Sequence, residues 1–278
     1  MTIARDSPRF LGTMIAYGFA GCDVAADLDI AARLGASVLE ILPDWRVLPD
    51  PEPLRVRVAD AGLAIHSAHG CWGGQSILAP RVDLGDLNPR THSASVDDLK
   101  RCIDWLSAAG GTCLVVHPGG LSDRVQADPR RDALTRGLIA LADHARGTRV
   151  VLCVENMPPG VHPGSQMDEI ASVVGGIARD EVALALDTGH ANISASVPGE
   201  TIQAGRLLRT THVHDNDGRQ DSHLPPGLGT IAWDDWKKAL NSIGYNGPIM
   251  LECIRHLRRH PQSMTPELLD LLKGLITL

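Results

Sequence analysis

The sequence predicts a single α/β domain in which eight strand–helix units close into a barrel. Eight short apolar runs alternate with longer amphipathic stretches along the 278 residues. Such alternation is typical of parallel strands joined by right-handed helical crossovers, and eight units in about 250 residues match the size of a (β/α)8 barrel. An open, doubly wound sheet is the alternative, but no GxGxxG motif follows the first strand. The predicted strands are residues 11–17, 37–42, 63–69, 112–117, 149–156, 182–187, 210–215 and 248–253.

Two stretches between these strands show helical periodicity. Within residues 95–110, apolar side chains recur at i, i+3, i+7 and i+10, so they share one face of a helix. We expect Ser93 or Ser95 to cap the start of this helix and Gly110 to end it. Residues 233–244 predict a second helix, which ends at its last glycine.

Composition limits the class of protein and its partners. Apolar residues make up 44% of the chain and aromatic residues only 3%, so aliphatic side chains must fill the core. No run approaches the length of a membrane span, and the first twelve residues lack the apolar region of a signal peptide. The net charge of −7 argues against a broad nucleic-acid-binding face. Six scattered cysteines without CxxC spacing favour a reduced, cytoplasmic setting, and a homo-oligomer stays open.

Carboxylates and histidines follow nearly every predicted strand, at the end where barrel enzymes hold their chemistry. One such residue alone is usually a helix cap, an ion-pair partner or a hydrogen-bonded core residue. Five consecutive strands share the pattern, however, and burying so many carboxylates without a cation would be costly. The pattern favours a divalent metal site with oxygen and imidazole ligands, which suit Mn²⁺, Co²⁺, Mg²⁺ or Zn²⁺. In chain order the residues are Glu40, His66, His69, His117, Glu155, Asp187, His190, His212, His214 and Glu252.

Four motifs carry a family resemblance. VENMP, LDTGH, HVHDND followed by DSHLPPGLGTI, and LEC occur in this order at the ends of strands five to eight. Together they resemble the xylose isomerase-like TIM-barrel superfamily, which includes sugar-phosphate isomerases and epimerases, ketose 3-epimerases, hydroxypyruvate isomerase and endonuclease IV-type AP endonucleases. The resemblance covers nearly the whole chain and implies one TIM-barrel domain over residues 1–278 with a small carbohydrate substrate.

The resemblance also implies roles for particular residues. In epimerase-like members, the two glutamates of the metal site also act as acid and base on opposite faces of a ketose. His190 matches a substrate-contacting histidine of those enzymes, and Arg219 lies near their arginine that holds the ketose oxygens. The implied metal site is Glu155, Asp187, His214 and Glu252, with Glu155 and Glu252 as the catalytic pair.

The endonuclease IV branch offers an alternative with three zinc ions. Asp221 and His223 would either bind a further metal or organise their loop. The seven residues from His214 to Asp221 form a shorter loop than in the nuclease branch, and HSAHGCWGG lacks the bulky residues which that branch wedges into DNA. The further zinc ligands implied by this branch are His66, His117, His190, Asp221 and His223.

The remaining candidates surround this site. Since His212 and His214 lie two residues apart on a strand, they face the same side; we predict that His214 is the ligand and that His212 lies one layer deeper, orienting its neighbours. The basic segment 254–260 could steer a phosphorylated sugar, although a solvated loop is the simpler interpretation. Further predicted substrate contacts are His69, Glu40, Trp45 and Trp72, with packing or an ion pair as the alternative role.

A reaction follows from these assignments. A divalent ion would chelate the carbonyl and adjacent hydroxyl of a sugar and stabilise an enediolate. Glu155 would take a proton from one face and Glu252 would return one to the other, which gives an epimerase, whereas one glutamate working on two adjacent carbons gives an isomerase. The alternatives are a trinuclear-zinc phosphodiesterase, a dehydratase or lyase of a keto-sugar or inositol-like substrate, and a barrel that binds without catalysis.

Overall fold

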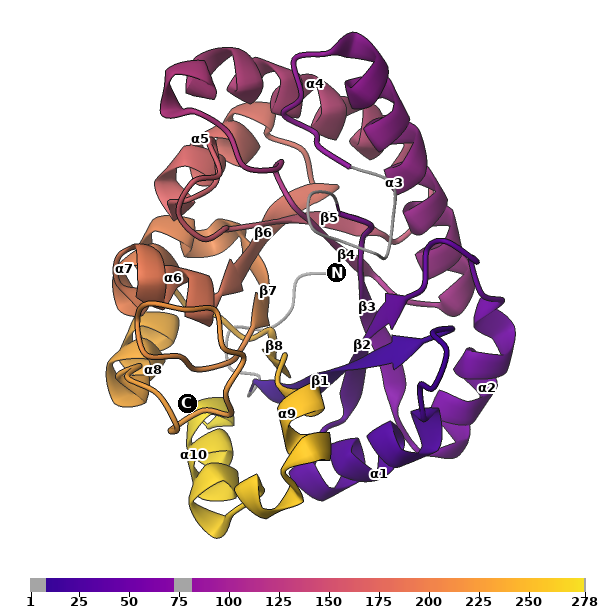
Figure 1. The fold of residues 1–278 in the computed structure, drawn as a ribbon, viewed down its shortest axis with the longest axis vertical. Helices are drawn as coiled ribbons and strands as arrows, with labels where there is room; N and C mark the ends of the chain where they lie inside the picture. Colours follow the sequence, from indigo (N-terminus) through magenta and orange to yellow (C-terminus); the bar gives the residue numbers. More distant parts are fainter. Residues whose placement is uncertain (1–8, 73–81, 278) are drawn as a thin grey trace.

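The computed structural model describes residues 9–72 and 82–277. Eight parallel strands form a ring with helices outside it, which confirms the predicted α/β class and (β/α)8 TIM barrel (Figure 1). Every predicted strand is present, and the largest shift is at β7, which ends at His212 rather than at residue 215. Residues 1–8, within the N-terminal stretch considered above, lie outside the described residues. The strands are β1 Phe10–Tyr17, β2 Val38–Pro43, β3 Ala64–His69, β4 Cys113–Val116, β5 Val151–Glu155, β6 Val182–Asp187, β7 Leu208–His212 and β8 Pro248–Leu251.

The strand order explains why the strand-end residues meet. Consecutive strands pair in parallel from β1 to β7, and β8 pairs with β1. The ring closes between β7 and β8, where the Val213 amide donates to the Met250 carbonyl at 2.7 Å and the Glu252 amide donates to the Val213 carbonyl at 3.0 Å. Because all strands run the same way around a closed ring, their carboxyl ends share one mouth.

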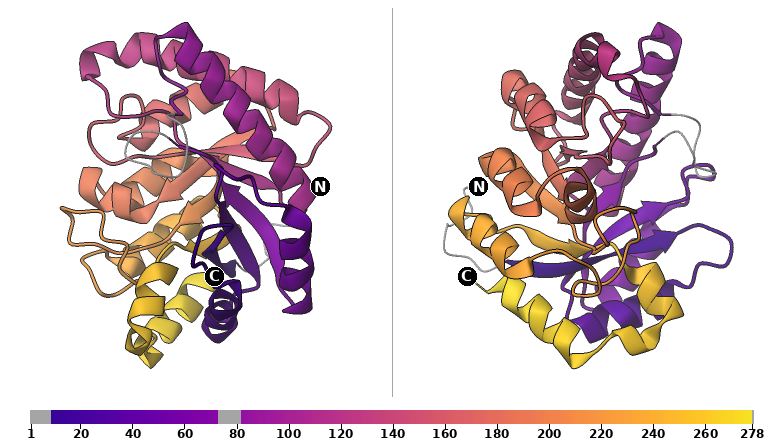
Figure 2. Two further views of the ribbon diagram at one scale, coloured as in Figure 1. Left: turned by 45° about the vertical axis from the view of Figure 1, so that its right-hand side comes forward. Right: turned by 60° about the vertical axis from the view of Figure 1, so that its left-hand side comes forward.

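Helices cover the outside of the ring (Figure 2). Helix α3 begins earlier than predicted, because Pro89 occupies its first turn and the Asn88 side chain accepts a hydrogen bond from the Arg90 amide. The predicted Ser93 or Ser95 cap is therefore wrong, while the end at Gly110 is confirmed by its left-handed φ of 86°. The helices are α1 Val24–Leu34, α2 Pro51–Asp60, α3 Pro89–Ala109, α4 Ala127–Ala145, α5 Met167–Ile177, α6 Thr188–Ser194, α7 Val197–Ala204, α8 Trp233–Ser242, α9 Ile254–Arg259 and α10 Pro266–Ile276.

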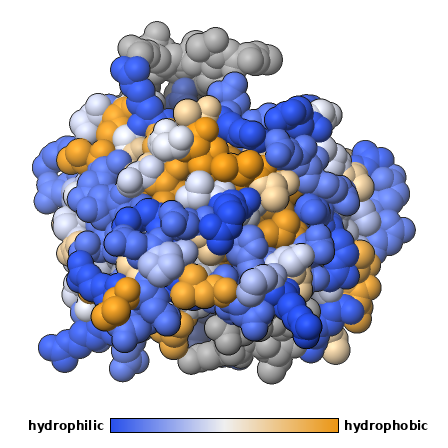
Figure 3. All heavy atoms as spheres, turned by 90° about the horizontal axis from the view of Figure 1, so that it is seen from above, coloured by the Kyte–Doolittle hydropathy of each residue, from blue (hydrophilic) through white to orange (hydrophobic). Residues whose placement is uncertain are grey.

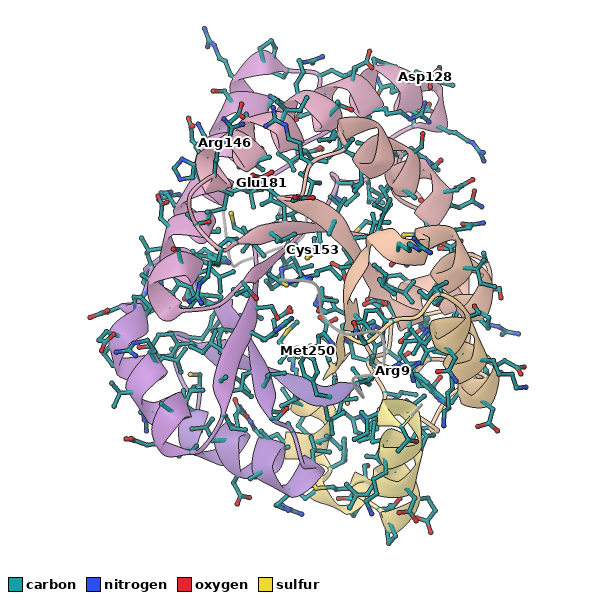
Figure 4. All side chains as sticks on the ribbon, turned by 180° about the vertical axis from the view of Figure 1, so that it is seen from behind. Arg9, Asp128, Arg146, Cys153, Glu181 and Met250 are labelled. Carbon is teal, nitrogen blue, oxygen red and sulfur yellow. The ribbon has the colours of Figure 1, made fainter. Side chains whose placement is uncertain are left out.

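Aliphatic side chains fill the core, as the low aromatic content requires. The main cluster lies between strands and helices, and a small cluster of Cys113, Val115, Cys153 and Ala185 lies inside the ring. Seen from behind, Cys153 and Met250 mark the centre of the barrel (Figure 4). All six cysteines are free thiols. Hydrophilic residues cover much of the face in Figure 3, and no helix among the described residues is long and apolar enough to cross a membrane.

Candidate active site at the barrel mouth

A cavity of about 1450 Å³ opens at the mouth of the barrel, over the carboxyl ends of the strands. Both glutamates of the predicted catalytic pair line it, together with most of the predicted histidines. The structure therefore brings side chains from β3, β4, β5, α6, α9 and the loop after β7 around one space. The lining residues predicted from the sequence are His69, Trp72, His117, Glu155, His190, Asp221, His223 and Glu252.

The centre of the site is His212, whose side chain is fully buried on β7. Its Nδ1 lies 2.7 Å from Oε1 of Glu155 and 3.1 Å from Oε2 of Glu252. Asp187 joins the same group: one ligand atom from each of these four residues lies within 4.8 Å of the others. Three residues of the predicted ligand set, Glu155, Asp187 and Glu252, are thus neighbours, and the histidine between the two glutamates is His212.

His214 lies to one side of this centre. Its Nε2 is 3.0 Å from Oδ2 of Asp187, and its ring stacks on that of His223 with 4.1 Å between centroids. Both strand-seven histidines point inward as expected, but the glutamate side chains extend to the deeper one. The role of His214 as a metal ligand stays a prediction: its Nε2 lies beside Asp187, and its buried Nδ1 has no hydrogen-bond partner among the described residues. His214 also groups with Asp221 and His223.

Glu40 holds the opposite edge of the His212 ring. Its Oε1 lies 2.8 Å from Nε2 of His212, and its Oε2 accepts a 2.6 Å hydrogen bond from the Ser67 hydroxyl. A register shift between β2 and β3 at Leu39/Glu40 pairs Glu40 with Ser67. Because Glu40 is fully buried, the predicted contact with a sugar hydroxyl is wrong and the ion-pair alternative describes the residue. This contact directs Nδ1 of His212 toward the two glutamates.

Two smaller groups flank the centre. On one side, Oε2 of Glu155 faces Nε2 of His117 at 3.2 Å and Nε2 of His69 at 3.7 Å, yet it makes no hydrogen bond within the described part of the chain. On the other side, Oδ2 of Asp221 lies 3.4 Å from Nε2 of His190 and 3.2 Å from Nε2 of His223. Each group joins one carboxylate to two imidazoles, which is a ligand set that zinc accepts.

His66 lies outside both groups, contrary to its prediction as a further ligand. Its ring contacts that of Phe10, with 5.8 Å between centroids, near the start of β1. His69, three residues later at the end of β3, is the strand-three histidine that reaches Glu155. The sequence offered both histidines at this strand end, and the length of β3 decides between them, because only its last residue reaches the mouth.

The carboxylates of the site favour positive charge beside them, as the pKa shifts of the neighbouring groups show. Burial alone would raise the pKa of the Glu155 carboxyl, but His212 and His117 pull it well below its ordinary value. Burial lowers the pKa of His212, and Glu40, Glu155 and Glu252 outweigh this and raise it well above its ordinary value. Burial also lowers the pKa of His190 and of His223, but nearby carboxylates outweigh it. Asp187 is the foremost cause that raises the pKa of His190 to about 10, and Glu252 is the foremost cause that raises the pKa of His223 to about 10. The carboxylates thus favour cationic imidazoles, and a divalent ion meets the same demand.

The LDTGH motif positions its own members. Asp187 caps α6 by accepting a 2.7 Å hydrogen bond from the His190 amide. A Cβ on Gly189 would overlap the His214 ring, so only glycine fits there. Asn156 of VENMP accepts from the Asp187 amide at 2.7 Å and, through its carbonyl oxygen, lies 2.8 Å from Nδ1 of His190. Asn156 was missed in the sequence analysis, although it adjoins Glu155 in a quoted motif.

The other predicted contacts divide between cavity and packing. Trp72 lines the cavity, with its ring edge against His69 at 4.7 Å. Trp45 is buried below, where its indole N–H donates to the His69 carbonyl at 3.0 Å and its ring packs on Trp105, so its role is the packing alternative. Arg219 is exposed on its loop and is absent from the cavity lining, so the structure does not bring it to the site.

The loop between β7 and α8 is anchored by Asp215, a fully buried carboxylate. It accepts hydrogen bonds from the amides of Asn216, Gly227 and Ile231 at 2.9, 2.9 and 3.2 Å, and from the Trp233 indole at 3.1 Å. These bonds fix both ends of the loop that carries Asp221 and His223.

Replacing Asp215 with alanine is expected to lower the free energy of unfolding by about 3 kcal/mol, because several buried donors lose their acceptor. Urea denaturation measures this change. The matched control is Asp217→Ala in the same loop, where the exposed carboxylate bonds, among the described residues, only to the nearby amides of Arg219 and Gln220; it should cost less than about 1 kcal/mol. Equal effects of the two variants would show that Asp215 is no anchor.

Comparison with known proteins gives the family. The model of the xylose isomerase-like TIM barrel matches residues 28–275. A ketose 3-epimerase from Arthrobacter globiformis is 27% identical over 218 residues, which cover 74% of this chain and 70% of that protein. A probable endonuclease 4 from Mycoplasma pneumoniae is 22% identical over 247 residues, which cover 82% of this chain and 84% of that protein.

A solved structure of D-allulose 3-epimerase from Methylomonas sp. matches with a TM-score of 0.76 and 20% identity, and the match covers 98% of this chain and all of that chain. At this identity the likeness shows the fold alone. The chain spans 63% of the length of two uncharacterised archaeal relatives that it also matches. Since the family match runs through nearly all strands of the barrel, the chain belongs to the xylose isomerase-like TIM-barrel family.

Proposed function

We propose that the protein is a divalent-metal-dependent isomerase or epimerase of a sugar or sugar phosphate. The observation that carries this proposal is the placement of Glu155 and Glu252, which enter one cavity from β5 and from the end of β8 and flank Nδ1 of His212. The likeness to a ketose 3-epimerase supports the substrate class.

The residues of the central set fit a divalent ion. Glu155, Asp187, His212 and Glu252 supply carboxylate and imidazole donors without thiolate, a set suited to Mn²⁺, Co²⁺, Mg²⁺ or Zn²⁺. The buried Oε2 of Glu155 supports this fit, because it has no hydrogen bond among the described residues and is free to bind a cation. When bound, the ion would polarise the substrate carbonyl and acidify the neighbouring C–H bond.

The two glutamates would then divide the proton transfers. Glu155 removes the proton from the carbon next to the carbonyl, and Glu252 delivers a proton to the opposite face, which inverts that carbon. If one glutamate returned the proton to the adjacent carbon, an aldose and a ketose would interconvert. His190 and His69 wall the same cavity and would hold sugar hydroxyls, and Trp72 would cover an apolar face of the sugar.

Solvent exchange tests this function. We expect the protein, loaded in turn with each of the four metals, to incorporate deuterium from D₂O next to the carbonyl of at least one ketose, with the epimer or aldose as product. Metal-loaded protein that exchanges no proton in a broad panel of ketoses and ketose phosphates would contradict the proposal. Stable loss of water from the substrate would instead identify a dehydratase built on the same proton removal.

A second candidate is a trinuclear-zinc phosphodiesterase. It is favoured by the two flanking groups, Glu155 with His69 and His117 and Asp221 with His190 and His223, which could each hold a further zinc ion. The likeness to a probable endonuclease 4 supports it. Two to three zinc ions per chain, together with hydrolysis of a phosphodiester or of abasic DNA and no proton exchange in ketoses, would establish this candidate over the first.

Under either function, Glu40 orients His212 for the metal. Replacing Glu40 with glutamine keeps the shape but removes the charge that holds Nε2, and we expect a 10- to 100-fold weaker affinity for the metal, as is typical when the carboxylate behind a histidine ligand is lost. Competition with a metal chelator measures the affinity. Ser67→Ala, which removes only the hydroxyl bonded to Glu40, should weaken binding less than tenfold; no change in Glu40→Gln would refute the role.

A further inference from the structure

The basic segment predicted as a loop forms helix α9, and it lines the cavity. The helix starts at Ile254, directly after Glu252 and Cys253, and lies beside α1 (Figure 1). Glu252, the catalytic candidate, and the basic helix α9 therefore form consecutive parts of the same cavity wall. The lining side chains from this segment are Arg255, His256, Arg258, Arg259 and His260.

Two of these side chains, Arg258 and His256, contribute no free positive charge to the cavity. The Arg258 guanidinium forms an ion pair with Asp27 of α1, which also lines the cavity. His256 lies 3.3 Å from the Ser263 hydroxyl, and burial together with neighbouring His260 lowers its pKa, so it is neutral near pH 7. Neither residue leaves a net charge to attract a ligand.

Arg255 and Arg259 differ from their neighbours. They stand four residues apart, so they project from the same side of α9, and both side chains line the cavity. Within the described parts of the chain, neither guanidinium has a hydrogen bond or an ion pair. Two adjacent, unpaired guanidinium groups match the geometry of phosphate or carboxylate, which arginine binds through paired N–H donors.

The size of the cavity leaves room for such a ligand group. Sites for whole small molecules usually occupy about 300–1,000 Å³, whereas this cavity holds about 1450 Å³. A monosaccharide placed against Glu155 and Glu252 therefore fills only part of it. The unfilled part includes the wall formed by α9.

We propose that Arg255 and Arg259 form a subsite for an anionic group, a phosphate or a carboxylate, on the end of the sugar away from the reacting carbons. The proposal rests on the proposed function and narrows its substrate class to phosphorylated or carboxylated ketoses. The anion would also anchor the chain of the sugar, so that the carbonyl end meets the glutamate pair.

The test compares ketohexoses that differ only at C6: a 6-phosphate, a 6-carboxylate and the neutral 6-hydroxyl form. Calorimetry measures binding of each to the metal-loaded wild type and to the double variant Arg255→Ala/Arg259→Ala. We expect the wild type to bind one anionic form at least about tenfold more tightly than the neutral form and the double variant to lose that preference. The form preferred identifies phosphate or carboxylate as the group recognised.

The matched control is Arg136→Ala, which removes an exposed arginine of α4 outside the cavity lining and should keep the wild-type preference. Equal affinities of the wild type for all three sugars, or an anion preference that survives in the double variant, would overturn the subsite. Failure of the proposed function is distinguishable, because it would show as absent proton exchange with every sugar, whatever their affinities.

Discussion

Replacing Glu155 or Glu252 with glutamine is expected to slow the conversion of one epimer into the other by about a thousandfold. Each amide keeps the size of the side chain but can neither take nor deliver a proton, and positioned acid–base groups contribute on the order of 10²–10⁴ to rate. The measurement is deuterium incorporation from D₂O into the product epimer, followed by mass spectrometry under single-turnover conditions.

The two variants also separate acid from base. If Glu155 takes the proton in one direction, Glu252→Gln retains partial exchange from the substrate epimer that presents its proton to Glu155, and Glu155→Gln retains it only from the other epimer. Glu181→Gln is the control: Glu181 precedes β6, on the face seen from behind in Figure 4, and should leave the rate within about twofold of wild type. Full activity with full metal content in both site variants would contradict the assignment.

Replacing His212 with alanine is expected to weaken metal affinity by more than the roughly 100-fold that loss of a supporting residue costs, because it removes an imidazole ligand itself. His214→Ala is the matched variant, since it deletes the same ring two residues away on the same side of the strand. We expect it to weaken the central site at most about tenfold, because His214 contacts only Asp187 of that set.

Equilibrium dialysis of both variants against one divalent ion measures the difference, and circular dichroism checks that both remain folded. Loss of the central metal in His214→Ala with retention in His212→Ala would instead identify His214 as the ligand, as predicted from the sequence. The comparison is sharp because both histidines are fully buried and differ mainly in which carboxylates they face.

Periodicity in the sequence was sufficient for the fold. Apolar runs bounded by polar turns marked all eight strands, and strand alternation with helices predicted a parallel ring. The start of α3 escaped prediction because local capping by Asn88 and Pro89 starts the helix about two turns before the apolar periodicity begins. The conformation of 254–260 escaped because a short helix with charges on several sides carries little periodic signal.

The sequence predicted which residues gather at the candidate site, but it did not predict how deep in the barrel each one lies. Alternation along β7 shows that His212 and His214 face inward, but it does not show how far the glutamates of neighbouring strands extend toward either. The role of Glu40 depends on the same missing information, since its partner His212 lies 172 positions away in the sequence. Asn156 and Asp215 were not predicted for another reason: their roles depend on hydrogen bonds to backbone groups that only the folded loops bring near.

The most direct test of the account is the metal content of the wild-type protein, purified without added metal or chelator and measured by elemental analysis. Bound metal at the mouth of the barrel is required by both functions considered, and by the placement of four carboxylates around His212 and its neighbours. The account predicts at least one Mn, Co, Mg or Zn ion per chain, retained on dialysis and lost in His212→Ala. Metal-free protein that also fails to bind any of these ions at micromolar concentration would contradict it.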